Sequence, residues 1–187
     1  KVTIPVDGIS LDQASLTLVK GQSAQLLATV SPAEASDKTV TWSTANAAVA
    51  TVDANGLVTG VGRGDVYIEA KATDGTNAAA TFAVAVTQDV TEITVQETEV
   101  TVATKRSAPQ LHVQVLPQNA SNRKVIWTSS DESIATVNGY GTITGRKAGE
   151  CIVTCSSVSN PEVSVTVPVH VIQMVTDIQF TTEKGLS

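Results

Sequence analysis

The chain has 187 residues, 42% of them hydrophobic, and a net charge of −6 at pH 7. This acidic balance argues against nucleic acid as a partner, because nucleic-acid-binding proteins neutralise phosphates with clustered Lys and Arg. No apolar run approaches the roughly 20 residues that cross a bilayer as a helix, so this segment is not expected to span a membrane. The two Trp, two Tyr and two Phe are few for one large core but sufficient for two small ones.

Short runs of alternating apolar and polar residues follow one another from the N-terminus, which predicts β-strands separated by turns. Asn55–Gly56 and Asp74–Gly75 are tight-turn signals between such runs. No stretch shows helical periodicity over about ten residues, so we expect an all-β chain. The side chains predicted to point inward in the first half are Leu16, Leu18, Leu26, Ala28, Val30, Val40, Trp42, Val49, Val52, Val66, Ile68, Ala70, Phe82, Val84 and Val86.

The second half of the chain repeats the first at an offset of 85 residues, as Trp42 and Trp127 illustrate. The opening sequence VDGISL at Val6 recurs as VTEITV at Val90, at an offset of 84, and one extra residue near Lys105–Arg106 restores the offset of 85. The same opening returns as VTDIQF at Val175, 85 residues after Val90. Other pairs at the offset of 85 are Pro32 and Pro117, Gly56 and Gly141, Gly60 and Gly145, Gly64 and Gly149, and Val86 and Val171.

The repeat divides the chain into two expected domains, residues 1–88 and 89–173. Residues 174–187 are then the first strand of a third repeat or a C-terminal tail. Because a lone first strand cannot bury its own apolar face, we favour a longer array and expect further repeats of the same chain as neighbours. The junctions are very short, which favours a stiff, extended array over freely jointed domains.

Seven or so short strands in about 85 residues, with one Trp in the third strand, describe an immunoglobulin-like β-sandwich. The inter-sheet disulfide of antibody domains is missing from both copies. Cys151 and Cys155 lie on one predicted strand, roughly 13 Å apart at ~3.3 Å per residue, and are therefore too distant to pair. They occupy the places of Val66 and Ala70, so we expect two small buried hydrophobes.

Three stretches of sequence carry a family resemblance: the opening VDGISLD, then SLTLVKGQSAQLLATVSPAEA, then VTWSTANAAVATVDANGLVTGVGRGDVYIEA. Each has an equivalent in the second copy. Over essentially its whole length the chain resembles the bacterial immunoglobulin-like group 2 (BIG2) family, which forms tandem repeats in intimin- and invasin-type surface proteins. The second copy departs from the pattern at Asn138, where an Asp is usual.

One tripeptide and several carboxylates could carry chemistry. Arg63–Gly64–Asp65 spells the sequence that integrins read, but the second copy has Ala148–Gly149–Glu150 in its place. A backbone requirement for glycine at this turn therefore explains the motif better than integrin binding. The acidic residues lack the spacing of a calcium-binding loop. A calcium site between the domains, near Asp89 and Glu92, is kept as an alternative interpretation.

The histidines do not suggest a reaction. His112 and His170 alternate with inward residues, so both are expected to face solvent or a neighbouring module. No nucleophile, acid, base or metal ligand clusters with them in the sequence. We therefore expect no catalytic residue, no cofactor and no metal ligand, and predict that the chain is not an enzyme.

The resemblance implies a secreted or bacterial cell-surface module. We expect a stalk or spacer that displays a distal functional domain. The alternative is an adhesin or glycan-binding module that contacts a host protein or a surface polysaccharide through interstrand loops, because such loops carry variable side chains. The candidate ligand-binding residues in those loops are Asp74, Asn77, Asn138 and Tyr140.

Overall fold

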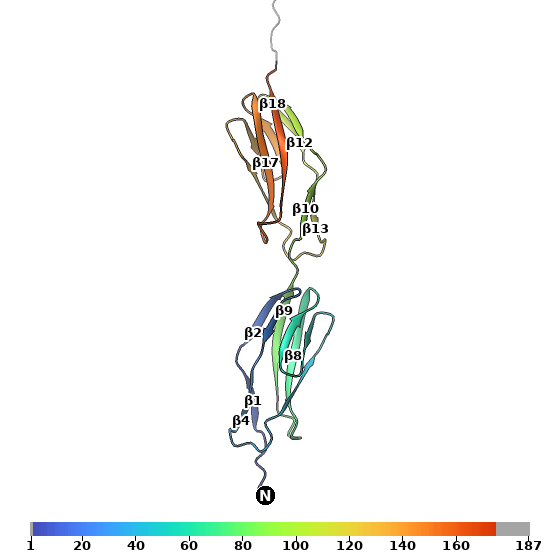
Figure 1. The fold of residues 1–187 in the computed structure, drawn as a ribbon, viewed down its shortest axis with the longest axis vertical. Helices are drawn as coiled ribbons and strands as arrows, with labels where there is room; N and C mark the ends of the chain where they lie inside the picture. The colour runs from blue at the N-terminus through green and yellow to red at the C-terminus, as the bar shows by residue number, and fades with distance from the viewer. Residues whose placement is uncertain (1, 175–187) are drawn as a thin grey trace, which may run out of the picture. The chain divides into compact units, whose positions relative to one another are not determined.

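The computed structural model describes residues 2–174, and their regular structure consists of β-strands (Figure 1). No helix in this part of the chain is long and apolar enough to cross a membrane. The residues form two compact units. The first unit extends to Asp89 and includes Pro117–Asn122, and the second unit comprises Val90–Leu116 and the residues from Arg123 onward. The predicted third repeat begins at Val175, outside the described residues.

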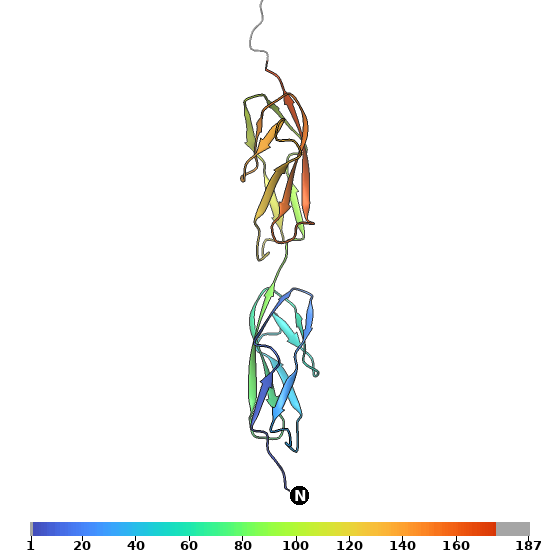
Figure 2. The same ribbon diagram turned by 90° about the vertical axis from the view of Figure 1, so that its left-hand side faces the viewer.

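The first unit contains nine strand segments arranged as two layers (Figures 1 and 2). One layer is the four-stranded sheet β2-β9-β8-β5, and the other combines the sheet β3-β7-β6 with the pair β1-β4. The segments are β1 (Gly8–Leu11), β2 (Ser15–Val19), β3 (Ser23–Gln25), β4 (Ala28–Ser31), β5 (Val40–Thr44), β6 (Ala50–Val52), β7 (Leu57–Gly60), β8 (Gly64–Ala72) and β9 (Ala79–Thr87).

The second unit repeats this topology strand for strand. Its layers are β11-β18-β17-β14 on one side, and β12-β16-β15 with the pair β10-β13 on the other. The segments are β10 (Glu92–Val95), β11 (Val100–Ala103), β12 (Ser107–Gln110), β13 (Val113–Leu116), β14 (Val125–Ser129), β15 (Ala135–Val137), β16 (Thr142–Gly145), β17 (Gly149–Ser157) and β18 (Ser164–Ile172).

The difference between nine segments and the expected seven strands has a simple cause. The opening strand is divided between the two layers, because β1 pairs with β4 whereas β2 pairs with β9. The strand after Gly21 is interrupted at Leu26 and Leu27, which separate β3 from β4. Counting each divided strand once gives seven, so the predicted all-β sandwich is confirmed.

The core of the first unit lies between its two layers, and most of the predicted inward residues line it. Val30 and Val40 pack instead in a smaller second cluster, and Ala28 is only half-buried. Val66, Ile68, Phe82 and Val84 are buried on one face of the β8–β9 pair. The residues between them on these strands face solvent, as the alternation of a half-buried sheet requires. The other predicted inward side chains that pack in or against this core are Leu16, Leu18, Leu26, Trp42, Val49, Val52 and Val86.

Each core contains one Trp, and its indole ring lies against a glycine. Trp127 is buried, and Trp42 is partly buried against the core of the first unit. A Cβ atom on Gly56 would lie 2.9 Å from Cε2 and Cζ2 of Trp42, and 2.7 Å from the carbonyl oxygen of Leu26. Gly56 also has a φ of +85°, which L side chains rarely adopt. Close approach and backbone conformation therefore both require glycine here.

The two cysteines of the second unit are free and buried, as predicted. Cys155 pairs across the sheet with Trp127, and Cys151 pairs with Val169. Burial raises the pKa of the Cys155 thiol to about 11 from an ordinary value of 9.0. The rise reflects the cost of placing a thiolate in an apolar core. Cys155 therefore behaves as a small hydrophobic group, and Cys151 is likewise buried.

We predict that Gly56→Ala destabilises the first unit more than Gly75→Ala. Gly75 has nearly the same φ, +88°, but a Cβ there would meet nothing within 4 Å. The backbone conformation should cost roughly 1–2 kcal/mol at either site, whereas overpacking against Trp42 should add roughly 1–3 kcal/mol at Gly56 only. Urea unfolding followed by Trp42 fluorescence, with Trp127→Phe in the background, measures the difference. Equal losses would show that Trp42 does not require the glycine.

We predict that Cys151 and Cys155 resist alkylation in the native chain. A rise from 9.0 to about 11 leaves roughly a hundredfold less thiolate at pH 8 for Cys155, and burial restricts access to both thiols. Iodoacetamide labelling read by mass spectrometry should proceed at least about a hundredfold faster after unfolding in urea. Rapid labelling without denaturant would contradict the packing described here.

Candidate functional site

The first pair of candidate ligand-binding residues lies in the β8–β9 loop of the first unit. Oδ2 of Asp74 accepts a hydrogen bond from the N–H of Val6 (2.7 Å). Oδ1 of Asp74 accepts from the hydroxyl (2.6 Å) and the N–H (3.1 Å) of Thr76. The Thr76 hydroxyl bond is the main cause of a lowered pKa for Asp74, and the Val6 bond adds to it. Asn77 is exposed, with a φ of +63°.

The second pair lies in the β15–β16 loop of the second unit. Oδ1 of Asn138 accepts hydrogen bonds from the N–H groups of Tyr140 (2.9 Å) and Thr142 (3.0 Å). Asp53 makes the matching bonds to Asn55 and Leu57 in the first unit. The Asn that departs from the family pattern thus performs the same turn-closing role as an Asp. The side chain of Tyr140 is 76% exposed.

These contacts separate the four candidates into two kinds. Asp74 and Asn138 hold their own loops with their side-chain oxygens. Asn77 and Tyr140 are exposed to solvent. The two loops belong to different units. Ligand binding by any of the four stays a prediction.

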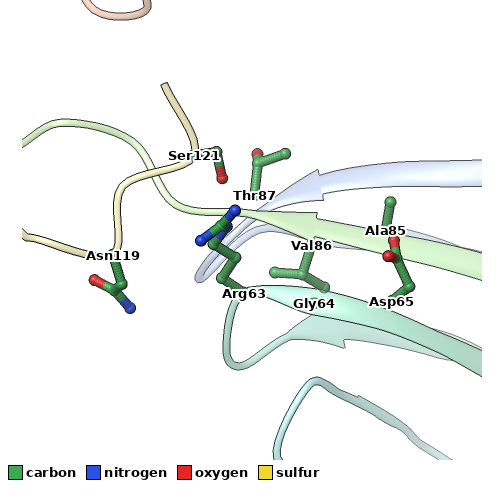
Figure 3. A pocket seen from close by; sticks show the side chains of 8 residues that line it. All are labelled: Arg63, Gly64, Asp65, Ala85, Val86, Thr87, Asn119 and Ser121. Atoms are coloured by element: carbon green, nitrogen blue, oxygen red, sulfur yellow. The ribbon is translucent and has the colours of Figure 1, made fainter. Parts of the chain in front are cut away.

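The integrin-like tripeptide lies where the chain enters β8, and the backbone explains its glycine. Gly64 has a φ of +151°, and Gly149 in the second unit has a φ of +154°. Arg63 extends from this turn beside Thr87 and Ser121, whereas Asp65 lies next to Ala85 (Figure 3). These residues line a hollow of about 440 Å³ within the first unit, together with Gly64, Val86 and Asn119.

A second hollow, of about 470 Å³, lies on the outer face of the four-stranded sheet of the first unit. The sequence indicates that Tyr67 faces away from the core, but it does not reveal which side chains surround it. Strand pairing brings residues from three strands together around this tyrosine. We call the outward-facing residues that line this hollow the sheet groove: Ser15, Thr17, Asp65, Tyr67, Ala83 and Ala85.

Both histidines contact carboxylates in the second unit. Nδ1 of His112 lies 2.5 Å from Oε1 of Glu97, and the His112 N–H donates to Oε2 of the same residue (2.9 Å). Nδ1 of His170 lies 3.2 Å from Oε1 of Glu150, and its Nε2 lies 3.8 Å from Oε2 of Glu99. Within residues 2–174, no group of three or more His, Cys, Asp or Glu side chains is arranged to hold a metal ion.

The chain matches the family described as Bacterial Ig-like domain (group 2) twice, over residues 5–83 and 89–167. An Ig-like virion protein of Serratia phage KSP90 is 32% identical over 157 residues, which cover 81% of this chain and 60% of that protein. A lacto-N-biosidase of Bifidobacterium bifidum is 41% identical over 88 residues, which cover 47% of this chain and 8% of the enzyme. The match to this enzyme is thus a partial one.

A solved structure, Drosophila N-cadherin EC1-4, has a TM-score of 0.50 at 11% identity and covers 90% of this chain and 50% of that one. This likeness shows the fold alone. The chain spans 15%, 20% and 60% of the first three curated relatives that it matches. The two family matches together cover most of the sequence, and each match corresponds to one of the two repeated sandwiches. The chain therefore belongs to the bacterial Ig-like domain (group 2) family, of which it carries two tandem copies.

Proposed function

We propose that this chain is a non-catalytic spacer segment of an extracellular or bacterial cell-surface protein, and that it displays a distal functional domain. The relation to an Ig-like virion protein supports a role at a surface. The observation that carries the proposal is the short, hydrogen-bonded connection between the repeats. Only residues 88–91 separate β9 from β10.

The connection is held at its start by ordinary strand pairing. Thr87 is the last residue of β9 and pairs with Val19 of β2. Its carbonyl oxygen also accepts a hydrogen bond from the N–H of Lys20 (2.8 Å). The residue that precedes the connection is therefore part of the four-stranded sheet.

The next residue, Gln88, is held by two further hydrogen bonds. Its N–H donates to Oγ of Ser121 (2.9 Å), and its carbonyl oxygen accepts from the N–H of Ser121 (2.7 Å). Ile4 and Ser36 form the same two bonds ahead of β1 (both 2.9 Å). Ile4 and Gln88, which precede the first strands of the two repeats, are thus each held by a serine at the same position of the repeat. Such a connection leaves few freely rotating residues, which suits a spacer that must hold its length.

A second candidate function is binding of a glycan or a host protein, through the loops or another surface. Exposed aromatic side chains favour it, because Tyr67 and Tyr140 are 64% and 76% exposed. The partial relation to a lacto-N-biosidase, of which this chain covers 8%, also supports association with carbohydrate. The spacer role does not depend on this binding.

We predict that the connection restricts motion between the repeats. Insertion of Gly-Ser-Gly-Ser after Asp89 should broaden the interatomic distance distribution from small-angle X-ray scattering, because the inserted residues behave as a flexible coil. Ser121→Ala, which removes the hydroxyl acceptor of the Gln88 N–H, should broaden it to a smaller extent. Ser36→Ala, at the matching position of the first repeat, is the control and should leave the distribution unchanged. A wild-type distribution as broad as that of the insertion variant would refute the spacer proposal.

A further inference from the structure

The sheet groove has a floor of two alanines and walls of different chemistry. Ala83 and Ala85 lie on β9, between β2 and β8 in the four-stranded sheet. Along one row across the sheet, Ser15 pairs with Ala83 and Ala83 pairs with Tyr67. Along the next row, Thr17 pairs with Ala85 and Ala85 pairs with Asp65. One wall therefore carries two hydroxyls, and the other carries an aromatic ring and a carboxylate.

The second unit shows what fills this position when the floor residue is large. His170 stands at the place of Ala85, because it pairs with Thr101 on β11 and with Glu150 on β17. Its imidazole lies 3.2 Å from Glu150 and 3.8 Å from Glu99, which occupy the places of Asp65 and Ser15. In the second unit, the imidazole ring of His170 thus fills the space that corresponds to the groove between Ser15 and Asp65 in the first unit.

The second unit also lacks the rest of the groove. Ile152 and Pro168 take the places of Tyr67 and Ala83. The hollow around them is lined by residues of β17, β18 and Ser130, and it does not reach β11. In the first unit the hollow extends to Ser15 and Thr17 on β2. The first unit therefore presents an open space where the second unit places its own ring.

We propose that the sheet groove of the first unit binds a pyranose ring of a neutral polysaccharide. A sugar ring has an apolar C–H face that packs on an aromatic ring such as Tyr67, which is 64% exposed. Its hydroxyls can donate to the Asp65 carboxylate and exchange hydrogen bonds with Ser15 and Thr17. Convergence of an apolar surface with a few polar groups is the usual composition of a small-molecule site.

The charges and the extent of the groove favour this occupant over others. A cationic ligand would meet one carboxylate and then Arg63, which lines the adjoining hollow. An apolar peptide would cover the polar atoms of both walls without satisfying them. The two hollows share Asp65 and Ala85 in their linings, so the space continues along the strands beyond a single ring. A polymer of neutral sugars matches that continuity.

The proposal is tested by affinity electrophoresis of the 187-residue chain in gels containing soluble arabinan, galactan, xylan, mannan or β-glucan. We expect at least one of these polysaccharides to retard the wild-type chain. Tyr67→Ile and Ala85→His should each weaken the retardation by about tenfold or more. Both variants introduce the residue that stands at the matching position of the second unit, so the fold accommodates them. Circular dichroism confirms that each variant is folded.

Ile152→Ala is the matched control, because Ile152 is an exposed side chain at the matching position of the second unit. Retardation should survive this change, whereas Tyr140→Ala tests binding through the β15–β16 loop. The proposal is overturned if none of the neutral polysaccharides retards the wild-type chain, or if only acidic polygalacturonate does. It is also overturned if both groove variants bind normally, or if only Tyr140→Ala abolishes binding. These outcomes leave the spacer proposal intact, because scattering measures it separately.

In a second measurement, a soluble oligosaccharide of the retarding polysaccharide is titrated into ¹⁵N-labelled chain and followed by NMR. The amide signals of Thr17, Ala83 and Ala85 should shift. Those of Thr101, Val169 and His170, on the corresponding strands of the second unit, should not. Shifts confined to the loop around Tyr140 would place binding elsewhere and overturn the proposal.

Discussion

The long pairing of β8 with β9 determines most of what each surface of the first unit can do. Eight consecutive residue pairs, from Gly64–Val86 to Lys71–Ala79, fix the register of these strands. Because side chains alternate between faces, this register buries Val66 and Ile68 and exposes Tyr67. A slip of one residue would exchange the two sets. The core and the sheet groove thus lie on opposite faces of the same pair of strands, and one register determines both. The pairing of β17 with β18 fixes the faces of the second unit in the same way.

Much of this arrangement can be predicted from the sequence, since it depends on local patterns and on the repeat. Alternation identifies the inward residues of β8 and β9, and the offset of 85 explains the cysteines, the tryptophans and the glycine of the integrin-like tripeptide. The division of the opening strand between two sheets is less predictable, because β1 and β2 have similar composition and differ only in their distant partners.

The sheet groove could not be predicted for the same reason. Tyr67 is recognisable as an outward residue, and the β8–β9 pairing places Ala83, 16 positions away, beside it. Ser15 joins them only because β2 pairs with β9, which brings it to Ala83 from 68 positions away. Asp74 and Asn138 show the converse limit. Their positions in loops suggest ligand binding, whereas their oxygens are engaged with nearby backbone N–H groups, and local sequence does not distinguish these two uses.

The parallel pairing of β2 with β9 bears on how the first unit would carry a mechanical load. β2 lies near the start of this unit and β9 at the end of its main segment, so a pull on the two ends drives these strands in opposite directions along their length. The five pairs from Ser15–Ala83 to Val19–Thr87 would then be strained together rather than opened one after another. β11 and β18 give the second unit the same geometry. Resistance to shear is therefore built into the sheet order, without any covalent cross-link.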